Sequence, residues 1–212
     1  MRKIYILAIA SLFSVMTTSA FSEMGMGITA NYASVDTSGT ETLRDSANKT
    51  STSVTEDIVI PEIFVEAIGD AGAFGIAYIP AQALGSKSRS DTNSEGDTGT
   101  YKAEAELDQH VMIYADLNLG EVYGSTVYAK GGLSHAKIKT TEALNSGSSY
   151  PDKDVLGLTF GLGAKGDFGG SYYYKIEGTY TEYDSYDANS ASNKIEADTE
   201  VTSVKASIGY KF

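Results

Sequence analysis

The chain has no cysteine, no tryptophan and only three prolines among 212 residues. The absence of cysteine excludes a disulfide framework, thiol chemistry and a lipid-bearing cysteine after a leader. Basic residues are also scarce, and a formal net charge of −12 argues against binding to nucleic acid, whose phosphates attract basic residues. After residue 20, no uninterrupted apolar run approaches the roughly 20 residues of a membrane helix.

Residues 1–22 predict a secretory signal peptide. Two basic residues precede an uncharged apolar run over 4–15, and small residues follow it. This run is too short to span a membrane as a helix. Cleavage is expected after Ala20 or Ser22 and takes the net charge to −14, since both leader basic residues are lost. The exported domain is then 23–212.

The exported part alternates apolar and polar residues over long stretches, a pattern typical of β-strands. The last stretch, "VTSVKASIGYKF", places Phe212, Tyr210, Ile208 and Ala206 on one face and two lysines on the other. Fifteen tyrosines also favour strands. The pattern predicts eight strands, near 24–35, 57–68, 73–84, 104–118, 122–136, 155–166, 171–183 and 200–212. A ten-stranded count stays open, because a long connection could contain a hairpin.

The connections between these strands alternate strictly between long and short. The short ones lie at 69–72, 119–124 and 166–170, and the long ones, rich in Ser, Thr, Asn, Asp and Gly, at 36–56, 85–103, 137–154 and 184–199. An up-and-down meander then has all long loops at one end, and all turns and both termini at the other. The predicted strands exceed the mean of about 5–6 residues in soluble proteins and suit the 9–11 of a tilted membrane strand. The sequence predicts an all-β fold, a closed antiparallel up-and-down eight-stranded transmembrane β-barrel.

A soluble lipocalin-like barrel would show the same alternation with its apolar face turned inward. The one-sided long loops argue against it, and so do aromatic residues near the strand ends, which resemble membrane-interface girdles. These are Tyr123, Phe168, Tyr172, Tyr210 and Phe212 at the turn end, and Tyr32, Tyr180 and Tyr183 at the loop end. The polar face then lines the interior. We expect a paired polar network there, formed by Glu62, Glu66, Glu106, Asp108, His110, Lys130, Lys165, Lys175, Glu177 and Lys205.

The final strand resembles the assembly signal of bacterial outer-membrane barrels, with Phe212, Tyr210, Ile208 and Ala206 at the matching positions. The whole exported chain is similar in architecture to the small eight-stranded family of the OmpA membrane domain, OmpX and the opacity proteins. This resemblance implies a location in the outer membrane of a Gram-negative bacterium. The expected partners are outer-membrane lipid with lipopolysaccharide, the barrel-assembly machinery and an unknown surface ligand of the loops. We expect a monomer.

A histidine on the polar face and an acidic stretch could form chemical sites, but each has a simpler interpretation. His110 lies on the polar face near Asp108 and could serve as a general base, but no serine stands two residues away on its strand. Ser134 and His135 are adjacent and therefore point to opposite faces. We expect no enzymatic activity and no catalytic residue, with a lipid-modifying enzyme as the least favoured alternative.

The acidic stretch from Asp91 approximates a calcium loop through Asn93, Glu95 and Gly96, but Lys102 stands where that loop needs glutamate. The acidic cluster Asp184, Asp187 and Asp198 likewise has a solvated loop as its default interpretation. We expect no metal and no cofactor.

The predicted function is structural or surface contact through four long external loops. An eight-stranded barrel has an interior only wide enough for side chains to fill it. A small solute or ion pore is the alternative, because glycines on the inner face could leave cavities. These glycines are Gly25, Gly27, Gly157, Gly161, Gly163 and Gly209.

Overall fold

The structure, a computed structural model, describes residues 21–43, 49–92, 98–143, 152–189 and 193–212. Its elements are all β-strands: β1 (Phe21–Leu43), β2 (Lys49–Gly69), β3 (Gly72–Ile79), β4 (Gln82–Thr92), β5 (Thr98–Val122), β6 (Ser125–Ala143), β7 (Lys153–Gly169), β8 (Tyr172–Tyr183), β9 (Tyr186–Asn189) and β10 (Asn193–Lys211). Within these ranges no helix has the length and apolar character needed to cross a membrane. The predicted leader lies almost wholly outside them and stays a prediction.

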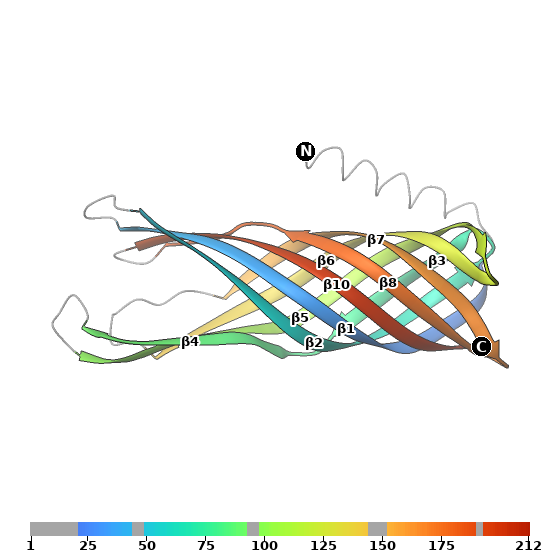
Figure 1. Ribbon diagram of the computed structural model, residues 1–212, viewed down its shortest axis with the longest axis horizontal. Coiled ribbons are helices and arrows are strands. Elements are labelled where there is room, and N and C mark those ends of the chain that lie inside the picture. Colours follow the sequence, from blue (N-terminus) through green and yellow to red (C-terminus); the bar gives the residue numbers. More distant parts are fainter. Residues whose placement is uncertain (1–20, 44–48, 93–97, 144–151, 190–192) are drawn as a thin grey trace.

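The strands form one closed antiparallel ring (Figure 1). The ring runs in the order β1, β2, β3, β5, β6, β7, β8, β10, and β1 closes it by pairing with β10 from Gly25 to Leu43. Two of the ten strands add no position to the ring, because β4 continues β3 and β9 follows β8. The prediction of a closed eight-stranded up-and-down barrel is therefore confirmed.

Three two-residue turns lie at one end of the ring, which we call the turn end. They are Asp70–Ala71 between β2 and β3, Tyr123–Gly124 between β5 and β6, and Gly170–Ser171 between β7 and β8. Tyr123 and Gly124 both have positive φ, at 49° and 79°, as a two-residue hairpin turn that matches strand twist requires. The C-terminus lies at the same end (Figure 1).

The four segments predicted as long loops are instead largely strand, and that prediction is wrong over most of their described length. β1 and β2 remain paired out to Thr42 and Lys49, and β5 and β6 out to Lys102 and Ala143. The Ser- and Thr-rich composition of these segments is typical of loops. Threonine and valine nevertheless favour strands when their backbone groups are paired. The tips at 44–48, 93–97, 144–151 and 190–192 lie outside the described residues.

At the end opposite the turns the barrel wall divides into two sheets. The first lobe consists of the outer parts of β9, β10, β1 and β2, and the second lobe of β4 with the outer parts of β5 and β6. Figure 1 shows them as an upper blue, teal and red arm and a lower green and yellow arm. β2 pairs with β3 only from Ile63 onward, and β4 pairs with β5 alone in the described chain. Each lobe therefore has an open edge.

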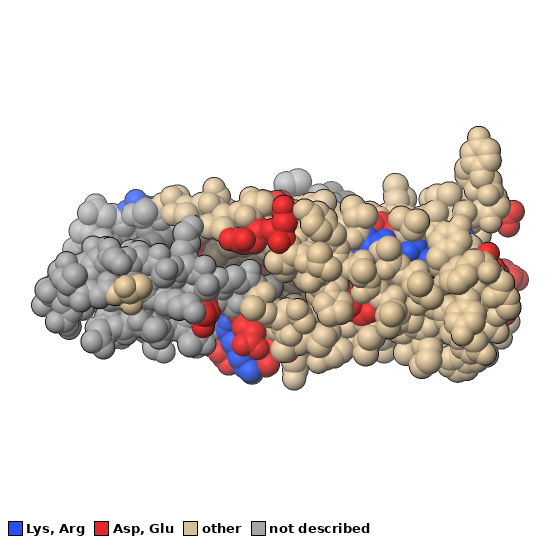
Figure 2. Space-filling model, turned by 60° about the horizontal axis from the view of Figure 1, so that its bottom comes forward, with Lys and Arg blue, Asp and Glu red and all other residues tan. Residues whose placement is uncertain are grey.

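The outside of the ring is apolar and the inside is polar, the reverse of a soluble barrel. Large aliphatic side chains are exposed on every strand of the ring, and Figure 2 shows a broad, mainly uncharged surface toward the turn end. The lipocalin-like alternative is thereby excluded, because it needs these side chains inside. The band includes Ile28, Val59, Ile63, Val65, Ile76, Ile113, Leu133, Leu156, Leu162, Ile176, Val204 and Ile208.

Aromatic rings border this band at the turn end. Phe168 stacks on Tyr172 with centroids 6.3 Å apart, and Tyr172 meets Tyr210 edge-on at 5.2 Å. Tyr32 and Tyr180 are exposed at the opposite border, as predicted. The placement of Tyr183 in that girdle is wrong. Its side chain shares the inward parity of β8 and bonds to a buried histidine.

Candidate functional site: a charged plug beneath an apolar chamber

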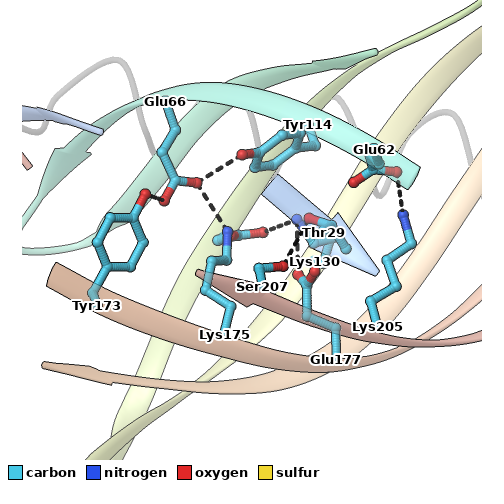
Figure 3. A network of polar contacts seen from close by, with 11 residues as sticks. Thr29, Glu62, Glu66, Tyr114, Lys130, Tyr173, Lys175, Glu177, Lys205 and Ser207 are labelled. Carbon is cyan, nitrogen blue, oxygen red and sulfur yellow. Dashed lines mark hydrogen bonds and ion pairs between the residues drawn. The ribbon is translucent and has the colours of Figure 1, made fainter. Parts of the chain in front are cut away.

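A buried ionic cluster fills the barrel toward the turn end (Figure 3). The Lys175 ammonium donates to Glu66 Oε2 at 2.9 Å and to Asp116 Oδ2 at 2.6 Å. The hydroxyl groups of Tyr114 and Tyr173 donate to the two oxygens of Glu66, at 2.7 and 2.8 Å. Asp116 is 0% exposed and Lys175 2%. We call the cluster the plug; it comprises Glu66, Tyr114, Asp116, Lys130, Tyr173, Lys175 and Glu177.

Lys130 of β6 links two carboxylates of the plug, Asp116 of β5 and Glu177 of β8. Its ammonium lies 2.8 Å from Asp116 Oδ1 and 2.9 Å from Glu177 Oε1, and 3.6 Å from the ring centre of Tyr114. All of these groups are buried. Because an unpaired charge in such a place is very costly, the plug persists only with its charges matched.

The described charges in and beside the plug match in number. A separate buried pair, Glu62 with Lys205 at 2.8 Å, lies beside the plug, and the half-buried Lys165 lies over the Tyr128 ring at 5.4 Å. Together with the plug they give four carboxylates, Glu62, Glu66, Asp116 and Glu177, and four ammonium groups, Lys130, Lys165, Lys175 and Lys205.

The inner glycines make room for the rings of this interior. A Cβ added at Gly75 would lie 2.5 Å from the ring of Tyr114, and one at Gly163 would lie 2.5 Å from the ring of Tyr128. The expectation that inner-face glycines leave cavities is wrong at Gly163, where a tyrosine occupies the space. Glycine here allows a bulky neighbour, so it closes the lumen instead of widening it.

Beyond the plug, toward the two lobes, lies an apolar chamber of about 410 Å³. Its wall is a contiguous cluster to which strands all round the ring contribute. The side chains are Ala33, Ile60, Ile79, Leu107, Ala136 and Val155, with Ile58, Ile138, Tyr183 and Val201 packed against them. The expectation of a polar interior therefore holds only for the part nearer the turn end.

The floor of the chamber is polar. His110 Nε2 lies 3.0 Å from the Tyr183 hydroxyl, and Lys205 is held by Glu62. His110 Nδ1, Asn31 Oδ1 and Ser134 Oγ are buried and have no hydrogen-bond partner within the described part of the chain. All three side chains line the chamber. Glu56, Glu104 and Asp184 line it as well, on the strand segments that enter the lobes.

Most of the predicted network residues lie inside the barrel. Glu62, Glu66, His110, Lys130, Lys175, Glu177 and Lys205 are buried there, and Lys165 is half-buried. Sequence reasoning left Tyr114, Asp116 and Tyr173 out of the network. Asp116 and Tyr114 share the parity of His110 on β5, and Tyr173 shares that of Lys175 on β8, so the alternation itself carried the signal.

The prediction is wrong for Glu106 and Asp108, because neither side chain joins the interior polar network. The ladder between β5 and β6 shifts register between Leu107 and Gln109, so Leu107 faces inward while Glu106 is exposed. Across from this bulge the chain passes through Pro80, which has no N–H for the ladder and separates β3 from β4. The Asp108 carboxylate instead contacts Lys139 at 2.8 Å, and this hydrogen bond raises the lysine's pKa. The bulge thus separates Asp108 from His110.

The other sequence candidates are placed as follows. Phe212, Tyr210, Ile208 and Ala206 all face outward, and the Phe212 N–H donates to the Met24 carbonyl at 2.9 Å. Ser134 points inward and His135 outward, as their adjacency predicts.

The approximate calcium motif lies mostly at 93–97, outside the described residues. In the described ranges no three acidic or histidine side chains are grouped as metal ligands. This includes the acidic cluster Asp184, Asp187 and Asp198.

A row of carboxylates marks the border of the apolar band on the lobe side. Glu200 of β10 is paired directly with Asp36 of β1 on one side and with Glu182 of β8 on the other. Asp57 of β2 lies close by, opposite Ser34. Like charges placed opposite each other on a sheet are destabilising, so this row lies where water can screen it.

No family model and no curated protein matches this chain. Solved structures do. The outer membrane protease OmpT from Escherichia coli matches with a TM-score of 0.51 at 10% identity, over 92% of this chain and 98% of that one. Ail, the attachment invasion locus protein of Yersinia pestis, covers 90% and 100% at 12% identity with a TM-score of 0.47. OprG from Pseudomonas aeruginosa covers 90% and 97% at 14% identity, also with 0.47. At these identities the likeness is one of fold.

Proposed function

We propose that this protein, an eight-stranded outer-membrane β-barrel of a Gram-negative bacterium, is a non-conducting anchor that holds two sheet lobes above the membrane for contact with a polypeptide partner. The observation that carries the proposal is the continuation of paired strands far past the apolar band. β1 has 23 residues, and about 9–11 suffice to cross the bilayer. The remainder extends beyond the lipid as ordered sheet.

The plug supports a non-conducting barrel. Its charged groups are all paired within 3 Å and span the lumen from Glu66 on β2 to Glu177 on β8. An ion path needs groups that can exchange water and ions, whereas these groups are buried and matched to one another. The pore alternative has less support, since the ring of Tyr128 occupies the space beside Gly163.

The open edges of the lobes favour an extended polypeptide as the partner. Residues 49–62 of β2 pair with β1 on one side only, and β4 pairs only with β5, within the described ranges. An unpaired edge presents a row of N–H and C=O groups to which another strand can add. Over 51–55 the exposed side chains of β2 are all Ser or Thr, which do not obstruct such pairing.

The contacts of His110 and Ser134 give no support to a catalytic role. OmpT is a protease, and a related role would need a nucleophile within reach of its base. Here neither Ser134 Oγ nor His110 Nδ1 has a partner among the residues that the structure describes, so the two are not bonded to each other. The other ring nitrogen of His110 contacts a tyrosine instead of a carboxylate. We propose no enzymatic activity.

Removing the outer part of the first lobe tests the contact role. Thr37 and Val54 are directly paired, so residues 38–53 can be replaced by Asn-Gly, a favoured two-residue turn. Random peptides displayed on phage are selected on the nanodisc-embedded protein and counter-selected on the trimmed variant. We expect enriched peptides with alternating β-branched residues that bind the full protein and lose binding to the trimmed one. A matched control replaces Tyr123 by Asn at the turn end and keeps binding.

Equal binding of the selected peptides to both proteins would overturn the contact role. Planar-bilayer recording tests the anchor role independently. We expect no steady single-channel openings from the refolded protein. Regular openings that persist in the trimmed variant would favour the pore.

A further inference from the structure

The chamber above the plug is the feature that the anchor role leaves unused. It combines about 410 Å³ of space with a ring of aliphatic side chains and a polar floor. An apolar wall is unremarkable in a core, where side chains fill the space, but here the space is not filled. A volume of this size lies within the range of about 300–1,000 Å³ that is typical of small-molecule sites.

We infer that this chamber binds a neutral amphiphile with one hydroxyl group and a short aliphatic body. The hydroxyl reaches the floor and the body lies along the wall, between the plug and the lobes. This inference goes beyond the proposed contact role, because it concerns a separate part of the molecule.

The polar atoms at the floor of the chamber favour a ligand with a hydroxyl group. Asn31 Oδ1 is an acceptor, whereas Ser134 Oγ and His110 Nδ1 can each take part in a further hydrogen bond. Buried polar atoms without partners are rare and costly, and here three of them line one chamber. A hydroxyl group both donates and accepts, so it can satisfy two of them at once. A ketone or ether lacks the proton that the Asn31 oxygen needs.

The charged side chains that line the chamber disfavour an anionic ligand. The one ammonium at the floor, Lys205, is already held by Glu62 at 2.8 Å and has little net attraction left for a carboxylate. Glu56, Glu104 and Asp184 line the chamber toward the lobes, where a ligand enters from outside. These acidic side chains repel an anion on its way in. A fatty alcohol fits better than the fatty acid of the same length.

n-Decanol is the probe, with decanoate and n-decane for comparison. Methyl-labelled protein in lipid nanodiscs is titrated, and contacts are read as nuclear Overhauser effects to individual methyl groups. The methyls of Ile79 and Leu107 report the chamber. Those of Ile28 and Ile208, which face lipid, report partition into the bilayer. We expect saturable contacts to Ile79 and Leu107 from n-decanol and weaker binding of decanoate.

Ala33→Phe fills the chamber and Ala30→Phe, on the outward face of the same strand, is its matched control. We expect loss of at least tenfold in n-decanol affinity for the first and no change for the second. Ser134→Ala keeps the volume, so it remains informative should Ala33→Phe fail to fold. It should weaken n-decanol binding about fivefold, the worth of one hydrogen bond, and leave n-decane unchanged.

The inference is overturned if n-decanol contacts only the lipid-facing methyls. It is equally overturned if decanoate binds more tightly than n-decanol, or if Ser134→Ala and the folded Ala33→Phe both retain wild-type affinity.

Discussion

Replacement of Lys175 by Met removes the central cation of the plug and should destabilise the barrel strongly. The ammonium lies 2.9 Å from a Glu66 oxygen and 2.6 Å from an Asp116 oxygen. At an effective dielectric constant of about 20, each contact is worth about 6 kcal/mol of Coulomb energy. The cost of keeping the ammonium itself out of water offsets much of that gain.

The net cost of Lys175→Met is expected at about 3–5 kcal/mol, the usual result of breaking a buried ion pair. Lys130 remains 2.8 Å from Asp116, and two tyrosine hydroxyls still donate to Glu66, so the remaining carboxylates are not wholly unpaired. The value should therefore lie toward the lower end of that range. Because the methionine is similar in length, little of the loss comes from an empty space.

Urea unfolding of the lipid-refolded protein measures this loss. The chain has no tryptophan, so far-UV circular dichroism and the shift of gel mobility on heating follow the unfolding. Lys194→Met is the matched control. It breaks an ion pair with Glu196 at 2.6 Å whose side chains are more than 40% exposed, so its effect on the free energy of unfolding should be small.

Glu66→Gln/Lys175→Met completes a double-mutant cycle. We expect a coupling energy of about 0.5–3 kcal/mol between the two sites, since they share one network. If Lys175→Met costs no more than Lys194→Met, the plug does not hold the barrel together, and the argument for a sealed lumen fails with it.

Four smaller changes test other parts of the structure by the same unfolding assay. Tyr123→Asn should stabilise by about 1 kcal/mol, because asparagine tolerates the positive φ at this turn better than tyrosine; no gain would refute the strain. Gly75→Ala should cost about 1–3 kcal/mol through its collision with a tyrosine ring, whereas Gly178→Ala, with nothing within 4 Å, should be nearly neutral. Equal effects would contradict the packing of the plug. Glu200→Gln should stabilise by about 0.2–1 kcal/mol at low salt, because it removes the repulsion between Glu200 and the carboxylates of Asp36 and Glu182 on the two neighbouring strands. The gain should vanish at high salt. Ala136→Ile should stabilise by about 1 kcal/mol by filling the chamber; destabilisation would show that the space is too small for a ligand.

The alternation of side chains predicted the strands, and the one-sided long connections together with the aromatic residues near the strand ends predicted the closed ring and its inverted faces. Period two is a strong signal over ten residues or more, and it also predicted that Lys130, Lys175 and Glu177 face inward. It could not reveal which interior side chains form ion pairs with each other, because partners such as Glu66 and Lys175 lie 109 positions apart in the chain. That depends on strand register and stagger, which single-strand patterns do not contain.

Two errors have definite physical causes. A bulge on β5 reverses the parity of every residue beyond it, so Leu107 replaced Glu106 and Asp108 on the inner face. The second error was to treat Ser- and Thr-rich segments as loops, although a ladder that is already paired can continue through them. The apolar chamber was partly readable, because Ile58 and Ile60 share the parity of Glu62 on β2.

The contrast between plug and chamber bears on why the chamber exists. In a matched buried network the loss of one member leaves another charge unpaired at high cost, so the network ties the walls of the barrel to one another. The plug fulfils this near the turn end. The chamber does the opposite: among the described residues, Asn31 Oδ1, Ser134 Oγ and His110 Nδ1 have no hydrogen-bond partner there. Such local losses of stability are typical of binding sites. If Ala136→Ile stabilises the barrel and also abolishes n-decanol binding, stability and ligand binding are in direct conflict at this chamber.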